Sequence, residues 1–179
     1  MSAQDPRNKF KTSDYDQQEQ ELPGLQSKMT PQPDCGETSY KGHERLKGYK
    51  MLVTGGDSAI GRAAAIAYAK EGADVAINYL PSEEEDAQEV KQVIEDAGQK
   101  GILIPGDLRD EQFNYDMVET AYNELGGLDN VTLVAGHQQY HDDIHGFNTE
   151  AFAETFETNV YPVFWTVQKA VSYTHLTLP

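Results

Sequence analysis

The stretch Lys50-Met51-Leu52-Val53-Thr54-Gly55-Gly56-Asp57-Ser58-Ala59-Ile60-Gly61-Arg62 decides the fold, because an apolar run ends in a glycine turn and an alanine-rich helical segment follows. The first N–H groups of a helix lack partners within it, and the aligned peptide dipoles put about half a positive charge there. A phosphate at that end accepts from the unpaired N–H groups and neutralises the partial positive charge. The stretch therefore predicts a phosphate cradle, in which Gly55 and Gly56 make the turn and Gly61 allows close helix packing.

After this turn, short apolar runs alternate with amphipathic segments. The expected strands are 51–53, 75–78, 101–105 and 131–135, and expected helices follow each of them, including one over 111–125 and one capped by Asn148 or Thr149. Strict alternation implies right-handed crossovers and a parallel sheet with helices on both faces. The predicted fold class is a doubly wound α/β sheet of the Rossmann type with its first four strands, and its ligand lies beyond their carboxyl ends.

The helix faces follow from apolar spacing. The helix after the first strand has an apolar face of Ile60, Ala63, Ala64 and Ala67, and the helix after the second strand has one of Ala87, Val90, Ile94 and Ala97. The helix after the fourth strand has an apolar face of Phe152, Phe156, Val160, Val163 and Val167. Ser82 with Glu85 three residues later predicts a capping box, and Gly98 closes that helix. The acidic run Glu83 to Asp86 then suits a helix start better than a metal site.

Composition excludes several classes of function. The 179 residues carry a net charge of −16, and residues 49–179 hold 22 of the 30 acidic but 7 of the 14 basic side chains. Such a surface repels nucleic acid. The single cysteine, Cys35, rules out an internal disulfide framework, and no apolar run approaches the ~20 residues of a membrane span. The first residues have no signal-peptide pattern, so we expect a cytoplasmic protein that binds neither nucleic acid nor membrane.

Residues 1–48 form a polar extension rich in Gln, Pro and Gly, with no apolar periodicity. Such a segment has no core of its own. We expect it to be a flexible leader or an arm that packs on a partner subunit. The Rossmann domain is expected over residues 49–170.

Four motifs in order resemble the short-chain dehydrogenase/reductase family over residues 49 to about 170. They are the turn from Thr54 to Gly61, Gly106-Asp107-Leu108, Val134-Ala135-Gly136, and Asn159 within Thr158-Asn159-Val160. The resemblance implies an NAD(P)-dependent oxidoreductase that interconverts an alcohol or sugar hydroxyl and a carbonyl, and that assembles as a dimer or tetramer. It also implies cofactor contacts by Gly55, Asp57, Ser58, Ala59, Ile60, Gly61, Tyr79, Asp107, Leu108, Ala135 and Gly136.

A closer likeness is to a bacterial, stress-associated subgroup similar to glucose/ribitol dehydrogenases. It rests on Pro23 to Met29, Pro33 to Glu37 and Ala76 to Pro81. Members of this subgroup carry such an extension, which favours packing of residues 1–48 on a partner subunit.

The chain also departs from the family pattern. Ala59 replaces the middle glycine of the turn, and we expect a negative φ there, with nucleotide binding retained. Leu133 and Val134 replace the two asparagines of the family's NNAG motif. The second strand ends in Asn78-Tyr79 rather than Asp, and Arg62 is the only cation expected nearby, so the cofactor is NAD or NADP.

The catalytic residues of the family are incomplete. Of its Asn-Ser-Tyr-Lys tetrad only Asn159 is matched, as a residue that helps hold a water in a proton relay. No Tyr-x-x-x-Lys follows it, because Leu176 and Thr177 stand where the lysine after Tyr173 would fall. We therefore expect these 179 residues to be inactive by themselves.

Residues 171–179, Val-Ser-Tyr-Thr-His-Leu-Thr-Leu-Pro, continue no helical period and resemble one translated frame of a sequencing adapter of transposase type. We expect them to be a non-native tail and the natural reading frame to continue beyond about Ala170. A naturally truncated paralogue is the alternative.

His137, His141 and His145 recur every four residues beside Asp142 and Asp143, which on a helix would be typical of a metal site. Glycines bracket the segment, so we favour solvated loop histidines and no metal. A non-catalytic nucleotide-binding or regulatory protein is the alternative to the enzyme, while a dehydratase or epimerase of the family's extended branch is disfavoured by the spacing of the turn.

Overall fold

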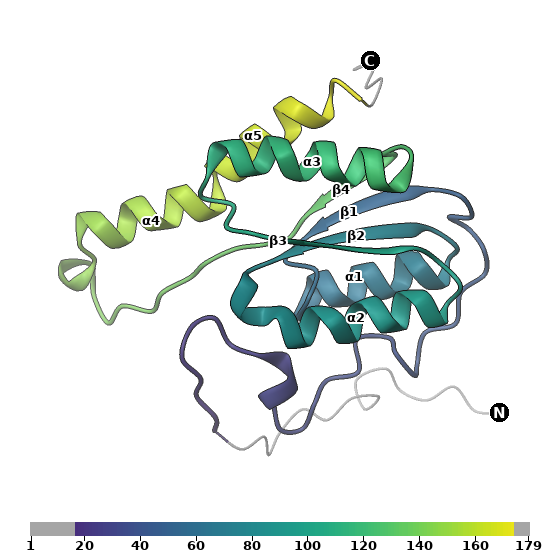
Figure 1. The fold of residues 1–179 in the computed structure, drawn as a ribbon. Helices are drawn as coiled ribbons and strands as arrows, with labels where there is room; N and C mark the ends of the chain where they lie inside the picture. Colours follow the sequence, from purple (N-terminus) through teal and green to yellow (C-terminus); the bar gives the residue numbers. More distant parts are fainter. Residues whose placement is uncertain (1–16, 174–179) are drawn as a thin grey trace, which may run out of the picture.

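Four parallel strands form the centre of the computed structural model, which describes residues 17–173 (Figure 1). They are β1 (Lys50–Thr54), β2 (Asp74–Tyr79), β3 (Gly101–Pro105) and β4 (Asn130–Leu133). The order across the sheet is β3-β2-β1-β4, so β1 lies between β2 and β4. This confirms the predicted doubly wound parallel sheet. Within the described chain, β4 pairs with β1 alone and forms an edge.

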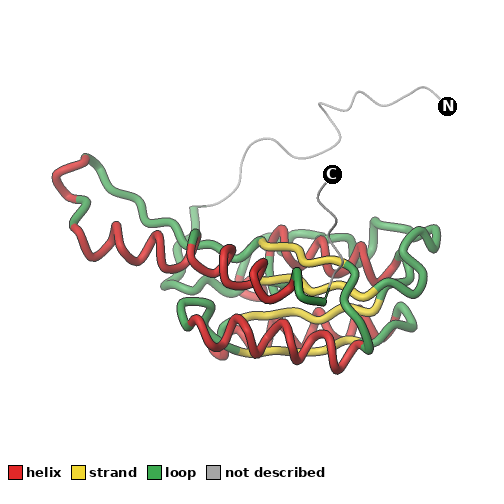
Figure 2. Tube along the Cα trace, turned by 90° about the horizontal axis from the view of Figure 1, so that it is seen from above, coloured by secondary structure: helices red, strands yellow, loops and turns green. Residues whose placement is uncertain are grey.

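Helices cover both faces of this sheet. On one face lie α1 (Ala59–Lys70) and α2 (Glu84–Asp96), and on the other lie α3 (Glu111–Leu125) and α5 (Tyr161–Ala170). The helix α4 (Thr149–Asn159) projects away from the sheet as an arm (Figures 1 and 2). Three short 3-10 turns complete the description: η2 (Gln26–Lys28), η3 (Pro81–Glu83) and η4 (Ile144–Gly146).

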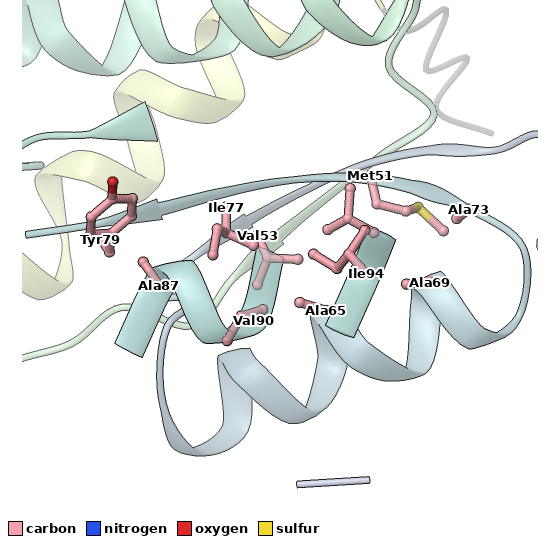
Figure 3. Close-up of a cluster of buried hydrophobic side chains, with 11 residues drawn as sticks. Met51, Val53, Ala65, Ala69, Ala73, Ile77, Tyr79, Ala87, Val90 and Ile94 are labelled. Carbon is pink, nitrogen blue, oxygen red and sulfur yellow. The ribbon is translucent and has the colours of Figure 1, made fainter. Parts of the chain in front are cut away.

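The core consists of two apolar clusters, one on each face of the sheet. The first lies between β1, β2 and the helices α1 and α2, with Val53, Ile77, Val90 and Ile94 fully buried (Figure 3). The second joins Leu52 on the opposite face of β1 to α3 and α5. Since alternate residues of a strand point to opposite faces, Leu52 and Val53 supply one cluster each. The buried face predicted for α2 is confirmed.

The predicted face of α1 is wrong. Its buried residues are Gly61, Arg62, Ala65, Ile66 and Ala69, whereas Ile60 is 74% exposed. Alanine and other small or apolar residues fill nearly all of this helix, so apolar spacing does not mark one face uniquely. The predicted capping box is also wrong. Glu83, and not Glu85, reaches back to the N–H of Leu80, at 3.0 Å, and α2 begins after η3.

The last predicted helix is divided in two. α4 ends at Asn159 and α5 starts at Tyr161, with Pro162 in its first turn, where proline is tolerated. The row expected to be its buried stripe is exposed instead, and Pro162, Thr166 and Ala170 face the core. Phe152, Phe156, Val160, Val163, Phe164 and Val167, named here the α4–α5 row, are each at least 38% exposed.

The described part of the N-terminal extension packs on its own chain. Lys70 donates to the carbonyls of Gly36, Glu37 and Tyr40 at 2.6–3.2 Å. The Glu71 carboxylate accepts from the backbone N–H groups of His43 and Arg45. Residues 17–48 thus contact their own chain, and packing of the extension on a partner subunit stays a prediction. Residues 1–16 lie outside the described part, as do residues 174–179 of the predicted tail.

No helix in the described range 17–173 is long and apolar enough to cross a membrane.

Candidate functional site

A cleft of about 570 Å³ lies at the carboxyl ends of the strands, between the turn after β1, the end of β2 and the loops after β3 and β4. Ten of the eleven residues predicted to contact a cofactor line it: Gly55, Asp57, Ser58, Ala59, Ile60, Tyr79, Asp107, Leu108, Ala135 and Gly136. Gly61 lies behind the turn and does not line the cleft. The structure thus brings together residues from four separate segments, as the parallel topology requires.

The turn after β1 is closed by two glycines. Gly55 adopts φ +61°, in the left-handed region that favours glycine. A Cβ on Gly61 would lie 1.9 Å from the carbonyl oxygen of Gly55. No side chain fits there, so Gly61 is what allows the first turn of α1 to approach the loop.

Ala59 differs from the expectation. It adopts φ +46°, not a negative φ, which costs an L-residue roughly 1–2 kcal/mol. Its backbone N–H donates to Oε1 of Gln26 at 2.7 Å. A buried side chain of the extension therefore supports the strained residue.

The next two N–H groups of α1 are free. The backbone N–H of Arg62 donates to the carbonyl of Ser58. Within the described residues, the N–H groups of Ile60 and Gly61 have no acceptor. Ile60 itself lines the cleft. The helix N-terminus thus keeps unpaired donors and a partial positive charge, as an anion-binding turn requires.

Asp57 places a carboxylate in the same wall. The residue is 2% exposed, and its Oδ2 has no hydrogen-bond partner in the described structure. Burial raises the pKa of Asp57 above its usual value, and the nearby Asp86 acts in the same direction. The cleft therefore contains a buried acceptor that the protein does not satisfy.

β2 ends in Asn78 and Tyr79, so no carboxylate side chain lies at its last two positions. The Asn78 amide donates to the carbonyls of Ile104 and Gly106 at 3.1 Å, which fixes the ends of β2 and β3 together. The Tyr79 hydroxyl donates to Glu84 at 2.5 Å. Burial, followed by this bond, raises the pKa of Tyr79.

Arg62 does not line the cleft, although it is the cation expected near the end of β2. It is buried and paired with Glu37 at 2.7 Å and with Glu89 at 3.1 Å. Both partners lie on the side of the extension and α2.

The loop after β3 presents Asp107 in an ion pair. Its carboxylate accepts from Arg109 at 2.6 Å, and this bond lowers the pKa of Asp107. Arg109 also approaches Glu154 of α4 at 3.4 Å. Asp107 therefore lies at the cleft as predicted, but with a cation already attached.

The loop after β4 is fixed at two points. The Thr54 hydroxyl accepts from the N–H groups of Val134 and Ala135 at 3.1 and 3.3 Å. The Asn159 amide accepts from the N–H of His137 and donates to its carbonyl, both at 2.7 Å. Asn159 does not line the cleft. Its side chain holds the loop that does, and its predicted role in a water relay stays a prediction.

The histidines lie outside the long helices, in the loop where they were expected, and the alternative helical row is not formed. His137 and His141 lie in an irregular loop and His145 in η4, so their four-residue spacing does not align them. His141 packs on Phe147, with ring centroids 4.9 Å apart. In the described part of the chain, no three metal-ligating side chains gather closely enough to share an ion.

Sequence reasoning missed one wall of the cleft. Leu22, Pro23 and Gly24 of the extension line it, opposite the loops of the sheet. The fully buried Asp86 of α2 anchors this segment, because it accepts from the N–H groups of Gln26 and Ser27 at 2.6 and 3.1 Å. Residues 22–28, named here the strap, thus belong to the site.

The remaining missed residues of the wall are Asn78, Leu80, Glu83, Gly106, Arg109, Val134, His137, Glu154 and Thr158. Most adjoin a predicted residue in the chain. For the strap the sequence offers one signal, the pattern Pro23 to Met29 that resembles the subgroup.

Comparisons with known proteins agree with this geometry. The family model for short chain dehydrogenase matches residues 50–175. The uncharacterized oxidoreductase YghA of Escherichia coli (strain K12) is 57% identical over 167 residues, which cover 93% of this chain and 57% of that protein. General stress protein 39 of Bacillus subtilis (strain 168) is 46% identical over 151 residues, 84% of this chain and 52% of that protein.

A solved structure shares the fold. The short chain dehydrogenase from Burkholderia cenocepacia J2315 in complex with NADP is 36% identical, with a TM-score of 0.68, over 73% of this chain and 52% of that chain. This chain spans little more than half the length of the curated relatives it matches.

Proposed function

The chain belongs to the short-chain dehydrogenase family, and on that premise we propose that it is the cofactor-binding half of an NAD(P)-dependent oxidoreductase. The longer protein interconverts an alcohol or sugar hydroxyl and a carbonyl on a small molecule. The observation that carries this proposal is the single cleft at the strand ends, which ten residues expected from the family motifs line together.

The residues of the cleft fit a dinucleotide. The free N–H groups of Ile60 and Gly61 suit the pyrophosphate, and Gly61 leaves no space for a Cβ that would push the turn away. Asp107, Leu108, Ala135 and Gly136 line the cleft, and the family resemblance assigns the first two to the adenine and the last two to the ribose side of the cofactor. When bound, the nicotinamide supplies the hydride acceptor or donor. The protein's part is to orient it and exclude water.

These 179 residues alone are proposed to bind the nucleotide without transferring hydride. The family uses a tyrosine and a lysine separated by three residues as its proton-transfer pair, and no such pair follows Asn159. A reading frame that continues beyond about Ala170 with Ser and Tyr-x-x-x-Lys favours the oxidoreductase. A natural frame that lacks them favours the alternative, a non-catalytic nucleotide-binding or regulatory protein.

We also propose that the longer protein forms homodimers or homotetramers. The α4–α5 row supports this, because large apolar side chains exposed together on two consecutive helices are typical of protein interfaces. The cytoplasmic location stays a prediction from the sequence.

Isothermal titration of the 179-residue chain with NAD⁺ and with NADP⁺ tests the proposal. We expect saturable binding of at least one of them. The variant Gly61→Ala should abolish binding, because its Cβ would displace the turn. Gly146→Ala is the matched control, since a Cβ there meets nothing within 4 Å. Failure of the folded wild-type chain to bind either dinucleotide contradicts the proposal.

A further inference from the structure

The wall of the cleft between β1 and β2 is acidic. Asp57 and Glu83 both line it. Burial raises the pKa of Glu83, and the field of Asp57 acts in the same direction. Asp57 is 2% exposed, and its Oδ2 has no hydrogen-bond partner among the described residues. This wall offers acceptors and a negative field.

Cations that could neutralise this wall are engaged elsewhere. Arg62 is held by Glu37 and Glu89 outside the cleft. Among the described residues that line the cleft, Arg109 is the one Lys or Arg. It is bound to Asp107 at the loop after β3, with contacts of 2.6–3.1 Å. Around Asp57 the lining of the cleft therefore includes no Lys or Arg, and the field of Arg62, which lowers the pKa of Asp57, acts from outside the cleft.

In a doubly wound nucleotide fold, the adenosine ribose lies between the glycine turn and the end of the second strand. That is the position of Asp57, Tyr79 and Glu83 in this chain. A ribose with free 2′ and 3′ hydroxyls brings two donors, and Oδ2 of Asp57 is an acceptor with no partner among the described residues. A 2′-phosphate brings further negative charge to the same place, and like charges brought together are strongly unfavourable.

We infer that the cleft selects NAD over NADP and that Asp57, in the turn itself, is the residue that determines this specificity. The inference rests on the proposed function. It assigns the choice to the glycine turn rather than to the end of β2, where Asn78 and Tyr79 are already bonded within the protein. Glu83 adds to the repulsion from the other side of the wall.

The test uses the full 179-residue chain and two probes that differ only in one group, ADP-ribose and its 2′-phosphate. Isothermal titration at pH 8 should give at least about tenfold tighter binding of ADP-ribose. Asp57→Asn keeps the shape and removes the charge, and it should narrow this ratio by about tenfold, mainly through tighter binding of the 2′-phosphate. Asp96→Asn, an exposed aspartate at the end of α2, should leave the ratio unchanged.

Glu83→Gln removes the second acidic side chain of the wall. It should narrow the affinity ratio between ADP-ribose and its 2′-phosphate by a smaller factor than Asp57→Asn does. Its control is Glu85→Gln, because Glu85 is exposed and does not line the cleft. Equal or tighter binding of the 2′-phosphate by the wild-type chain overturns the inference while leaving the proposed function intact. Binding of neither probe overturns both.

Discussion

Oε1 of Gln26 accepts a 2.7 Å hydrogen bond from the backbone N–H of Ala59, so the strap and the glycine turn are joined directly. The two residues are 33 positions apart in the chain. Gln26 is 5% exposed, and its own N–H is held by the buried Asp86. The extension is therefore a structural part of the nucleotide cleft.

Removal of the Gln26 side chain should destabilise the fold. In Gln26→Ala the Ala59 N–H loses its acceptor in a partly buried position, which costs about 1–3 kcal/mol in the free energy of unfolding. Urea denaturation followed by circular dichroism measures it. The control Gln92→Ala removes an exposed glutamine that bonds only to Asp96 on its own helix. A midpoint for Gln26→Ala as high as that of the control contradicts the prediction.

Replacement of Ala59 by glycine should raise the free energy of unfolding, whereas Gln26→Ala lowers it. Glycine adopts φ +46° without the roughly 1–2 kcal/mol penalty of an L-residue, although it loses about 0.5–1 kcal/mol through chain entropy. The net expectation is a stabilisation of about 0.5–1 kcal/mol. Ala63→Gly, in the regular part of α1, should instead destabilise by about 1 kcal/mol. Equal losses in the two variants would show that Ala59 carries no strain.

The sheet and most of its helices could be predicted from apolar alternation. The bounds expected for β3 and α3 are those observed, because Gly101 and Gly106 mark the ends of β3, and Asp110 and Gly126 cap α3. The same reasoning misread α1, where Ala and Ile occupy both faces and give no clear period. It also read α4 and α5 as one helix, although Pro162 was a signal for a new helix start.

The candidate site divides in the same way. Residues near the glycine turn and the strand ends could be predicted, because parallel topology brings strand ends together. The strap could not. Its position depends on polar contacts such as Asp86 with Gln26, 60 residues apart, and no local period encodes them. The left-handed Ala59 was missed for the same reason, since its partner lies in the strap.

The α4–α5 row should mediate self-association. Its six apolar side chains are exposed in one copy, and burying them against a second copy removes apolar surface from water. Phe164→Asp should shift the chain toward monomer in sedimentation velocity, because a charge would be buried in the contact. Ile144→Asp is the control, since Ile144 is 75% exposed and lies in η4, outside the row. An identical association state for both variants would exclude the row as the interface.

Glu71 should make the attachment of the extension depend on pH. Its carboxylate is 3% exposed and accepts from the Arg45 guanidinium, from the Tyr40 hydroxyl and from two backbone N–H groups. The bond from Arg45, followed by that from Tyr40, holds the pKa of Glu71 well below its usual 4.5. A carboxyl with a lowered folded-state pKa contributes stability above its unfolded pKa, and that contribution is lost as the pH falls toward the folded value.

The variant Glu71→Gln removes this contribution. At pH 7 its urea midpoint should lie well below that of the wild type. The gap should shrink as the pH falls from about 5 to 3, because the unfolded wild-type chain then binds a proton at Glu71 while the folded chain does not, which lowers the wild type's free energy of unfolding. Glu85→Gln, at an exposed position of α2, should follow the wild-type curve throughout. A gap between Glu71→Gln and wild type that stays constant down to pH 3 would mean that the Glu71 carboxylate acts through packing and not through its charge.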